Sequence, residues 1–398
     1  MSFLTQAKKM KENRSALHST YIIDGIQQKL TPAEILDGCL RGEEEDRRPS
    51  GTFDPVIDET LDPAPAAARF DPARAVEYLE GIAPLTGRTE DCPMEYSDQY
   101  TRSRISGALL DAIWRKGHFR LEDLSLDAEW EWNAGRLGNM AAFYSSAKAA
   151  ADQIDSLGIC LGGYSYSESP SEGGRVTFKV EAAERDPEEI VDDPEMEELL
   201  APSPFGSECP SIGHGRLTPE TAAKDPESWL ILIPFDSCDF RLGSSLLCKA
   251  FGSNGDPYPE IGDADYFMDC YEVVREFVED KVVIAGQTVG AGGLMAALKK
   301  MLPEDTAIQL DISGIMSAYG ERDAVRILFS EVPGALIQIS DIDYDYVDAE
   351  LLLQDIAYYP IGHPRTGSGG ITLRSGGESG ISGILQSLLN SQTSEGED

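Results

Sequence analysis

The sequence is poor in basic residues, and this shortage excludes one class of function. Its 398 residues include 33 lysines and arginines against 70 aspartates and glutamates, so the formal net charge at pH 7 is −37. The isoelectric point is near 4.3. Nucleic-acid backbones repel a chain this acidic, and no basic stripe interrupts the acidic residues. We therefore expect no nucleic-acid partner.

Long apolar runs are also missing. The longest, Trp229 to Phe235, has the length of a β-strand, whereas a membrane-spanning helix needs about 18 apolar residues. The basic segment 1–14 is not followed by the apolar segment that marks a signal peptide. We therefore expect no membrane partner and a cytoplasmic location.

Cysteine and histidine occur without the spacing that metal sites need. The seven cysteines form no C-x-x-C pair and the four histidines form no H-x-x-x-H pair. These patterns predict reduced thiols and no metal site built on imidazole or thiolate ligands. Apolar residues make up 41% of the chain, which is enough for the cores of two domains or more.

Regular periodicity begins near residue 103. Residues 121–132 alternate between apolar and polar, which is typical of a half-buried strand. The apolar residues of 140–157 recur at helical spacing, and a strand is predicted at 159–166. Beyond residue 228, predicted strands and helices alternate, which indicates an α+β fold with helices covering a sheet. The predicted strands there are 229–235, 282–286, 307–312, 335–339 and 371–374, and the predicted helices there are 244–251, 265–279, 294–302, 322–329 and 347–357. A further helix is predicted before this region, at 105–114.

Composition divides the chain into four segments. Residues 1–100 are irregular, with an amphipathic stretch at 20–40, an acidic run at 43–46 and a helix candidate at 72–82. An acidic, proline-containing stretch at 184–200 predicts a boundary. The expected segments are a divergent N-terminal region (1–100) that partly supplies strands of the first domain, a first domain (101–190), a second domain (203–375) and an acidic Gly/Ser-rich tail (376–398). The tail holds one short apolar helix at 381–389.

The most informative local feature is the glycine-rich segment 282–294. A buried strand leads into Gly290, Gly292 and Gly293, and a helix follows. Glycines let backbone N–H groups approach a ligand, and a helix N-terminus attracts anions, so this arrangement suits a phosphate. A tight turn that packs a helix on a sheet explains the same residues.

Three smaller features carry alternatives of their own. Gly243, Ser244 and Ser245 stand between a strand and a helix, where the serines either cap the helix or help to form a second anion site. Trp130 and Trp132 share one face of a strand and either pack in the core or stack on a base. Glu331 precedes a strand, where a glutamate is usually solvated.

From about Ile105 to Arg374, the chain resembles the second synthetase half of the large phosphoribosylformylglycinamidine synthases, in the aminoimidazole-ribotide-synthetase superfamily. The matching blocks follow the family's order. They are Gly107–Asp111 with Glu129–Trp132, the helix from Met140 to Gly158 with Gly162-Gly163 of a G-G-K-D-S motif, Arg241–Ser245 of an R-L-G-G-T/S turn, Val282–Leu294 of an H-D-V-S-D-G-G-L motif, and Leu328–Gly334 of an L-F-A-E-E-P-G motif.

The resemblance implies a synthetase-type N-terminal α+β domain, a C-terminal α/β layer domain and pairing of two chains into a homodimer. It also implies ATP and Mg²⁺ as cofactors of a C–N ligase, which phosphorylates an amide oxygen before ammonia displaces the phosphate. A nucleotide or another small molecule is then the expected ligand. The implied nucleotide-binding residues are Gly243, Ser244, Ser245, Gly290, Gly292 and Gly293, and the implied substrate-cleft residues are Glu331, Tyr164 and Glu129.

The sequence departs from the family where charge is needed. Tyr164 and Ser165 replace Lys and Asp of the G-G-K-D-S motif, and Glu129 replaces an Asn. In the second motif, Gln287, Thr288, Gly290 and Ala291 replace His, Asp, Ser and Asp. These replacements predict either a synthetase with lost or altered catalysis, or a non-catalytic binding or scaffold protein that keeps the fold. No catalytic residue and no metal ligand is assigned.

Overall fold

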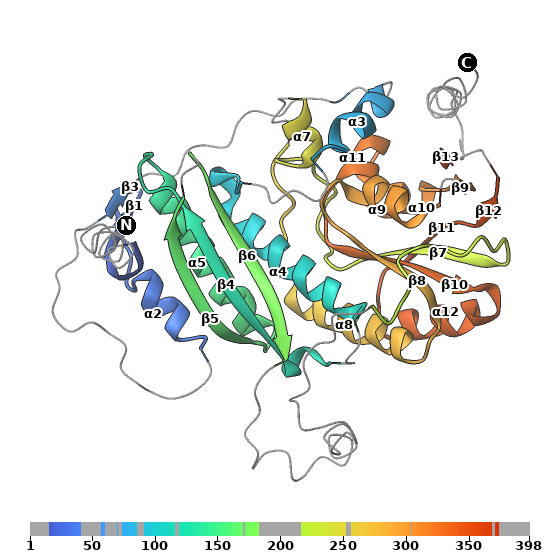
Figure 1. The fold of residues 1–398 in the computed structure, drawn as a ribbon, viewed down its shortest axis with the longest axis horizontal. Helices are drawn as coiled ribbons and strands as arrows, with labels where there is room; N and C mark the ends of the chain where they lie inside the picture. Colours follow the sequence, from blue (N-terminus) through green and yellow to red (C-terminus); the bar gives the residue numbers. More distant parts are fainter. Residues whose placement is uncertain are drawn as a thin grey trace, which may run out of the picture.

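The computed structural model describes residues 16–40, 57–59, 70, 74–85, 91–115, 119–169, 172–182, 216–251, 256–303, 305–367 and 371–373. The fold is α+β, as predicted, and is built around two larger sheets with helices packed on them (Figure 1). The acidic runs at 43–46 and 184–200, the tail from 376 and its helix at 381–389 lie outside the described residues.

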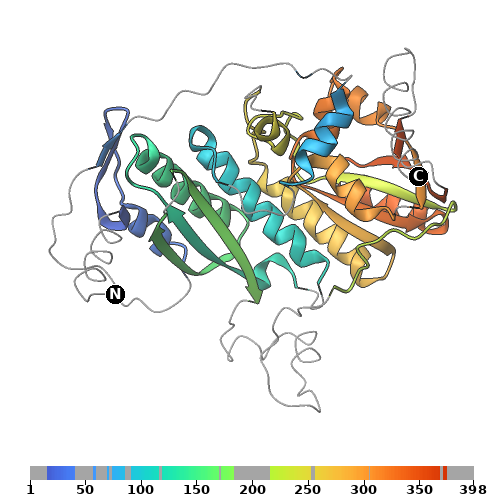
Figure 2. The ribbon, with the colours of Figure 1, turned by 45° about the horizontal axis from the view of Figure 1, so that its top comes forward.

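The first sheet holds three strands in the order β5-β4-β6. Strand β4 (Leu124–Trp132) runs parallel to β5 (Cys160–Glu168) and antiparallel to β6 (Gly174–Ala182). Its inward side chains are buried, and Asp127 and Glu129 on the other face are exposed, so the alternation read from the sequence is confirmed. Helices α4 (Ser97–Ile113) and α5 (Asn139–Ser156) cover the buried side (Figures 1 and 2).

The two strand tryptophans belong to the core of this first layer. Trp130 and Trp132 are fully buried, and each indole packs against Phe143 of α5. Trp130 donates to Ser146 Oγ at 2.9 Å, and Trp132 donates to the Asn139 carbonyl at 2.7 Å. Both N–H groups are therefore satisfied within the protein, and stacking of these rings on a base is excluded.

The second sheet is antiparallel, with the order β11-β7-β10-β8. Its strands are β7 (Ser228–Pro234), β8 (Val283–Val289), β10 (Gly334–Ser340) and β11 (Tyr359–Gly362). Both faces are covered, because alternate residues of β7 enter two different core clusters. On one side pack α8 (Ala264–Glu279) and α12 (Tyr344–Leu353), and on the other α9 (Gly293–Met301) and α11 (Ala324–Phe329).

Smaller elements complete the fold. Strands β12 (Pro364–Thr366), β9 (Thr306–Leu310) and β13 (Ile371–Leu373) form a third sheet. Strands β1 (Tyr21–Ile23), β2 (Ile26–Gln27) and β3 (Ile57–Glu59) form a fourth. The short helices are α2 (Pro32–Asp37), α3 (Ala75–Ile82), α7 (Leu246–Ala250) and α10 (Ser313–Ala318), and 3-10 turns lie at Met94–Tyr96, Leu121–Asp123 and Asp341–Asp343.

Several predicted boundaries were wrong. The stretch 20–40 is two strands and a short helix, because Asp24 and Gly25 turn the chain with positive φ and Thr31 caps α2. Strand β6 was missed, although residues 174–182 alternate. Strand β8 continues three residues past its predicted end at Gly286, because Gln287 and Thr288 still pair with β10. Strands β11 and β12 and helix α10 were also missed; each has six residues or fewer.

No helix of the described residues is both long and apolar enough to cross a bilayer. Within the same residues, the cysteines Cys39, Cys92, Cys160, Cys238, Cys248 and Cys270 are free thiols.

Candidate functional site

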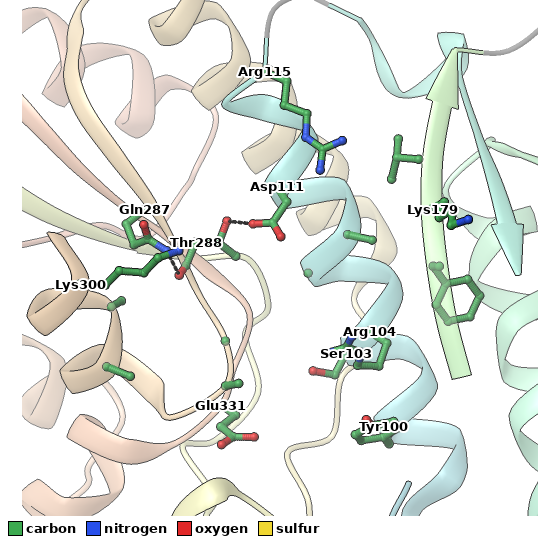
Figure 3. Close-up of a pocket in the computed structure, with 18 of the residues that line it drawn as sticks. Tyr100, Ser103, Arg104, Asp111, Arg115, Lys179, Gln287, Thr288, Lys300 and Glu331 are labelled. Atoms are coloured by element: carbon green, nitrogen blue, oxygen red, sulfur yellow. Dashed lines mark hydrogen bonds between the residues drawn. The ribbon is translucent and has the colours of Figure 1, made fainter. Parts of the chain in front are cut away.

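A cleft of about 710 Å³ separates the two larger sheets, with α4 and the edge of β6 on one side and β8 and α9 on the other (Figure 3). Its volume falls in the range of small-molecule sites. One face of α4 supplies residues at helical spacing, and Arg115 follows the helix. The lining residues of this wall are Tyr100, Ser103, Arg104, Gly107, Ala108, Asp111 and Arg115.

Glu331 lies at one end of the cleft and joins the two predicted anion-binding turns. Its Oε1 accepts a hydrogen bond from the backbone N–H of Leu246 at 2.7 Å, at the start of α7. The same oxygen accepts one from the backbone N–H of Gly292 at 2.8 Å, at the start of α9. A carboxylate of the chain therefore occupies the position that a bound anion takes at a helix N-terminus.

Two glycines beside Glu331 are required by the backbone. Gly292 and Gly293 have φ of 81° and 68°, a region that favours glycine. A Cβ on Gly293 would come within 2.7 Å of the Phe329 backbone. Gly290 differs, since a Cβ there would meet nothing within 4 Å, and this residue lines the cleft.

The second predicted turn is also built for packing. A Cβ on Gly243 would lie 2.3 Å from the Asp256 carbonyl oxygen. Ser245 caps α7, since its Oγ accepts from the Cys248 N–H at 3.3 Å and donates to the Leu242 carbonyl at 2.7 Å. Ser244 is buried with φ of 54°, and neither serine lines the cleft. Of the two alternatives for these serines, a helix cap or an anion site, Ser245 therefore fulfils the first.

The wall opposite α4 carries Gln287 and Thr288 from the end of β8. Thr288 Oγ1 donates to Asp111 Oδ1 at 2.6 Å and accepts from Trp114 Nε1 at 2.8 Å, which joins β8 to α4. Gln287 is 6% exposed, and its Oε1 is buried with no hydrogen-bond partner among the described residues. Its Nε2 donates weakly to the Thr288 carbonyl at 3.4 Å.

Arg216 supports the contact between β8 and Trp114. Its Nη2 donates to the Gly286 carbonyl at 2.5 Å, and its guanidinium lies 5.8 Å from the centre of the Trp114 ring. Burial lowers the pKa of Arg216 from its ordinary value.

At the opposite end of the cleft, burial raises the pKa of Tyr258 well above its ordinary value, and the Glu331 carboxylate raises it further. The Tyr258 hydroxyl is therefore neutral at physiological pH.

The structure places Glu129 and Tyr164 elsewhere. Both line a second, smaller pocket of about 290 Å³ on the first sheet. Glu129 is exposed on its outer face, and Tyr164 donates from its hydroxyl to Asp37 Oδ1 at 2.7 Å. Of the predicted residues, Glu331 and Gly290 line the larger cleft. Gly292 donates to Glu331 but does not line the cleft, and Gly243, Ser244, Ser245 and Gly293 do not line it either.

Sequence reasoning missed the cations of the cleft. Arg104, Arg115, Lys179 and Lys300 line it together with three acidic residues. Arg104, Ala108, Asp111 and Arg115 follow each other at intervals of four, three and four, so the helical period alone would have placed them on one face. Among the described residues, no group of three or more histidine, cysteine, aspartate or glutamate side chains is arranged to hold a metal.

Comparison with known proteins agrees with this architecture. Residues 226–363 match the family described as AIR synthase related protein, C-terminal domain. Over 349 residues the chain is 25% identical to the probable phosphoribosylformylglycinamidine synthase, chloroplastic/mitochondrial, of Arabidopsis thaliana. The chain is a relative of this synthase and of the aminoimidazole-ribotide-synthetase superfamily. The match covers 87% of the chain but 22% of the length of the Arabidopsis protein.

Two solved structures from Thermotoga maritima are also similar. PurLQS has a TM-score of 0.50 at 12% identity, over 73% of this chain and 41% of that one. PurL complexed with AMPPCP has a TM-score of 0.48 at 12% identity, over 73% of this chain and 42% of that one. At 12% identity, the likeness to PurLQS shows a shared fold and nothing more. The sequence similarity to the Arabidopsis synthase already indicates this fold.

Proposed function

We propose that this chain is a divergent relative of phosphoribosylformylglycinamidine synthase that keeps a ligand cleft and has lost or altered the ATP- and Mg²⁺-dependent ligation. The relationship supports the fold and the ancestral chemistry. The replacements at Tyr164, Ser165, Thr288 and Ala291 support the loss, because each removes a charge that the family's motif provides. Phosphoryl transfer relies on such charges to stabilise its transition state.

One observation carries the proposal. Glu331 Oε1 already uses one backbone donor beside each glycine turn, the N–H of Leu246 at 2.7 Å and that of Gly292 at 2.8 Å. A phosphate entering either turn would have to displace this carboxylate or lie beside it. At a separation of about 4 Å and an effective dielectric constant of about 20, two like charges repel by about 4 kcal/mol. Both turns therefore favour the internal carboxylate over a nucleotide phosphate.

Thermal unfolding of the full chain with and without Mg·ATP tests this proposal. A site filled at 100 times its Kd adds about 2.7 kcal/mol to the stability of the native state. We expect no rise in Tm with millimolar Mg·ATP, and a clear rise in the wild-type chain would contradict the proposal. In Glu331→Ala the two N–H groups are released, so a rise confined to that variant would support the blocking role of the carboxylate.

An active ATP-dependent C–N ligase is the opposite candidate. The size of the cleft favours it, since about 710 Å³ accommodates a nucleotide. ATP hydrolysis or phosphoryl transfer that depends on Ser244 or Glu331 would establish this candidate against ours. If neither ATP hydrolysis nor phosphoryl transfer is found, the proposal reduces to a non-catalytic binding or scaffold role.

We further propose that residues 101–190 and 203–375 are the two synthetase-like domains and that the chain forms a homodimer in the cytoplasm. The edges of the first sheet support the dimer, because an edge strand presents backbone N–H and C=O groups with which a second chain can pair. Strands β5 and β6 form the two edges of this sheet. Light scattering at micromolar concentration should give twice the mass of one chain, and a single-chain mass would contradict the dimer.

A further inference from the structure

Exposed apolar side chains gather on α12 and the 3-10 turn before it. Among the described residues, seven large apolar side chains are exposed, and four of them lie within residues 342–353. Single exposed apolar side chains are ordinary on a protein surface, whereas a cluster of them marks an interaction site. We call this cluster the outer stripe; its members are Ile342, which is 91% exposed, Tyr346, Leu352 and Leu353.

Helix α12 is apolar on two sides. Val347 and Leu351 face inward, where both are fully buried in the core cluster that also contains residues of α8. Tyr346 and Leu353 are seven residues apart, about two helical turns, so they share the outward face, and Ile342 extends the line by one turn. A helix that is apolar around its circumference is normally covered on all sides. The outward face of α12 therefore has the composition of a buried surface.

Carboxylates surround the outer stripe. Residues 341–355 include six acidic residues and no basic one. Partial burial raises the pKa of Tyr346 from its ordinary value. The carboxylates of Glu350, Asp280 and Glu276 raise it further, which shows that acidic groups of both α12 and the end of α8 lie near this ring. The stripe is therefore apolar in the middle and acidic at its rim.

The cations near the stripe do not cancel this charge. Arg275 of α8 is largely buried and is shared between Glu272 at 2.9 Å and Glu279 at 2.5 Å, with Glu276 at 3.8 Å. Lys281 is exposed next to the acidic end of α8. With both cations counted in full, segments 272–281 and 341–355 together hold ten acidic and two basic residues, a net charge of −8.

This combination of apolar surface and charge discriminates among possible occupants. Membrane surfaces are commonly anionic and would be repelled. A second copy of the chain, paired through the same face about a two-fold axis, would bring two acidic rims together. A helix with an apolar face flanked by lysines or arginines meets both requirements, because its apolar side chains cover the stripe and its cations face the carboxylates.

We infer that the outer stripe is a docking site for one cationic amphipathic α-helix of a partner protein. The eleven residues from Ile342 to Leu353 cover about 17 Å, which matches three turns of the partner helix. Figure 1 shows α12 beyond α8, away from the first sheet, and no residue of α12 lines the cleft. The inference therefore goes beyond the proposed function and uses a different surface from the homodimer.

Two synthetic peptides of equal composition test the inference with the full chain. Both have about 18 residues, long enough to form a helix, and contain only leucine and lysine. In the first, the leucines share one helical face; in the second, they are spread around the helix. Fluorescence anisotropy should show the first binding at least about tenfold more tightly. Equal affinities, or no binding of the first at about 100 μM, would overturn the inference.

Variants locate the site on α12. Leu353→Gln removes an apolar side chain but keeps a good helix former, so it should weaken binding about tenfold and leave the Tm almost unchanged. Leu137→Gln is the matched control, because Leu137 is 74% exposed and Leu353 is 75% exposed. It lies outside the stripe and should leave binding unchanged. Equal effects of the two variants, or no effect of Leu353→Gln, would overturn the assignment.

The acidic rim is tested in the same assay. Glu350→Gln should weaken binding and reduce its dependence on salt, because one screened attraction is removed. Glu172→Gln neutralises an exposed glutamate of the first domain and should change neither. Equal salt dependence in the wild-type chain and in Glu350→Gln would contradict a role for the rim.

Two further measurements address the other occupants. Light scattering should give the same mass for the wild-type chain and Leu353→Gln; a smaller mass for the variant would assign the stripe to a second copy and overturn the inference. Vesicles of phosphatidylserine and phosphatidylcholine should not bind the chain, and binding that Leu353→Gln abolishes would assign the stripe to a membrane instead. None of these assays contains ATP or Mg²⁺, so their outcome is independent of the proposed function.

Discussion

At Glu331, one carboxylate oxygen accepts hydrogen bonds from the first turns of two helices, α7 and α9. Hydrogen bonds to charged groups contribute about 1.5–3 kcal/mol each. Glu331→Ala should therefore lower the free energy of unfolding by about 3 kcal/mol, measured by urea denaturation. Glu331→Gln keeps an acceptor oxygen and should lose about 1 kcal/mol. Equal losses in the two variants would show that the carboxylate charge contributes nothing.

Ser244 carries the clearest backbone strain of the site. Its φ is 54°, where a residue with a Cβ is less stable than glycine by about 1–2 kcal/mol. Glycine in turn costs about 0.5–1 kcal/mol of unfolded-state entropy. We expect Ser244→Gly to be stabilising by up to about 1 kcal/mol in the same denaturation experiment. The neighbouring change Ser245→Ala, which removes the cap of α7, should be destabilising by about 1 kcal/mol.

Among the elements, the start of α9 depends on its glycines in different ways. Gly293→Ala places a Cβ within 2.7 Å of the Phe329 backbone at a φ of 68°. We expect a loss of more than about 2 kcal/mol, because backbone strain and a clash add together. Gly290→Ala has no neighbour within 4 Å and should leave the stability within about 0.5 kcal/mol. Similar losses at both positions would contradict the packing explanation.

Element boundaries were predictable where a burial pattern extended over many residues. Strand β4 alternates over nine residues and α5 is periodic over 18, and both were located to within three residues. The end of β8 was not, because its polar residues Gln287 and Thr288 resemble a turn in the sequence. They remain in the strand because β10 pairs with them, Leu336 opposite Gln287 and Ala335 opposite Thr288. Propensity is local, whereas this pairing joins residues almost 50 positions apart.

For the whole molecule, the excess of acidic residues predicts a response to salt. A net charge of −37 destabilises the compact state by self-repulsion, and salt screens this repulsion. We expect the Tm to rise by several degrees between 10 mM and 500 mM KCl. Measuring with KCl and with tetramethylammonium chloride separates screening from binding of a particular cation. A Tm that falls or stays constant in both salts would contradict the prediction.

The sequence alone determined the fold class, because the alternation of 124–132 and the periodicity of 140–157 depend only on which residues must leave water. It also showed which charges of the synthase motifs are missing. Only the tertiary structure decided the roles of the glycines and of Glu331, since a contact between Glu331 and Leu246 spans 85 positions of the chain. It likewise placed Gln287, Asp111 and Arg115 at one end of a cleft and Glu129 and Tyr164 outside it. The physical reason is that the spacing of apolar residues along an element already shows which of its faces is buried. A hydrogen-bond partner, in contrast, is set by how distant parts of the chain fold together.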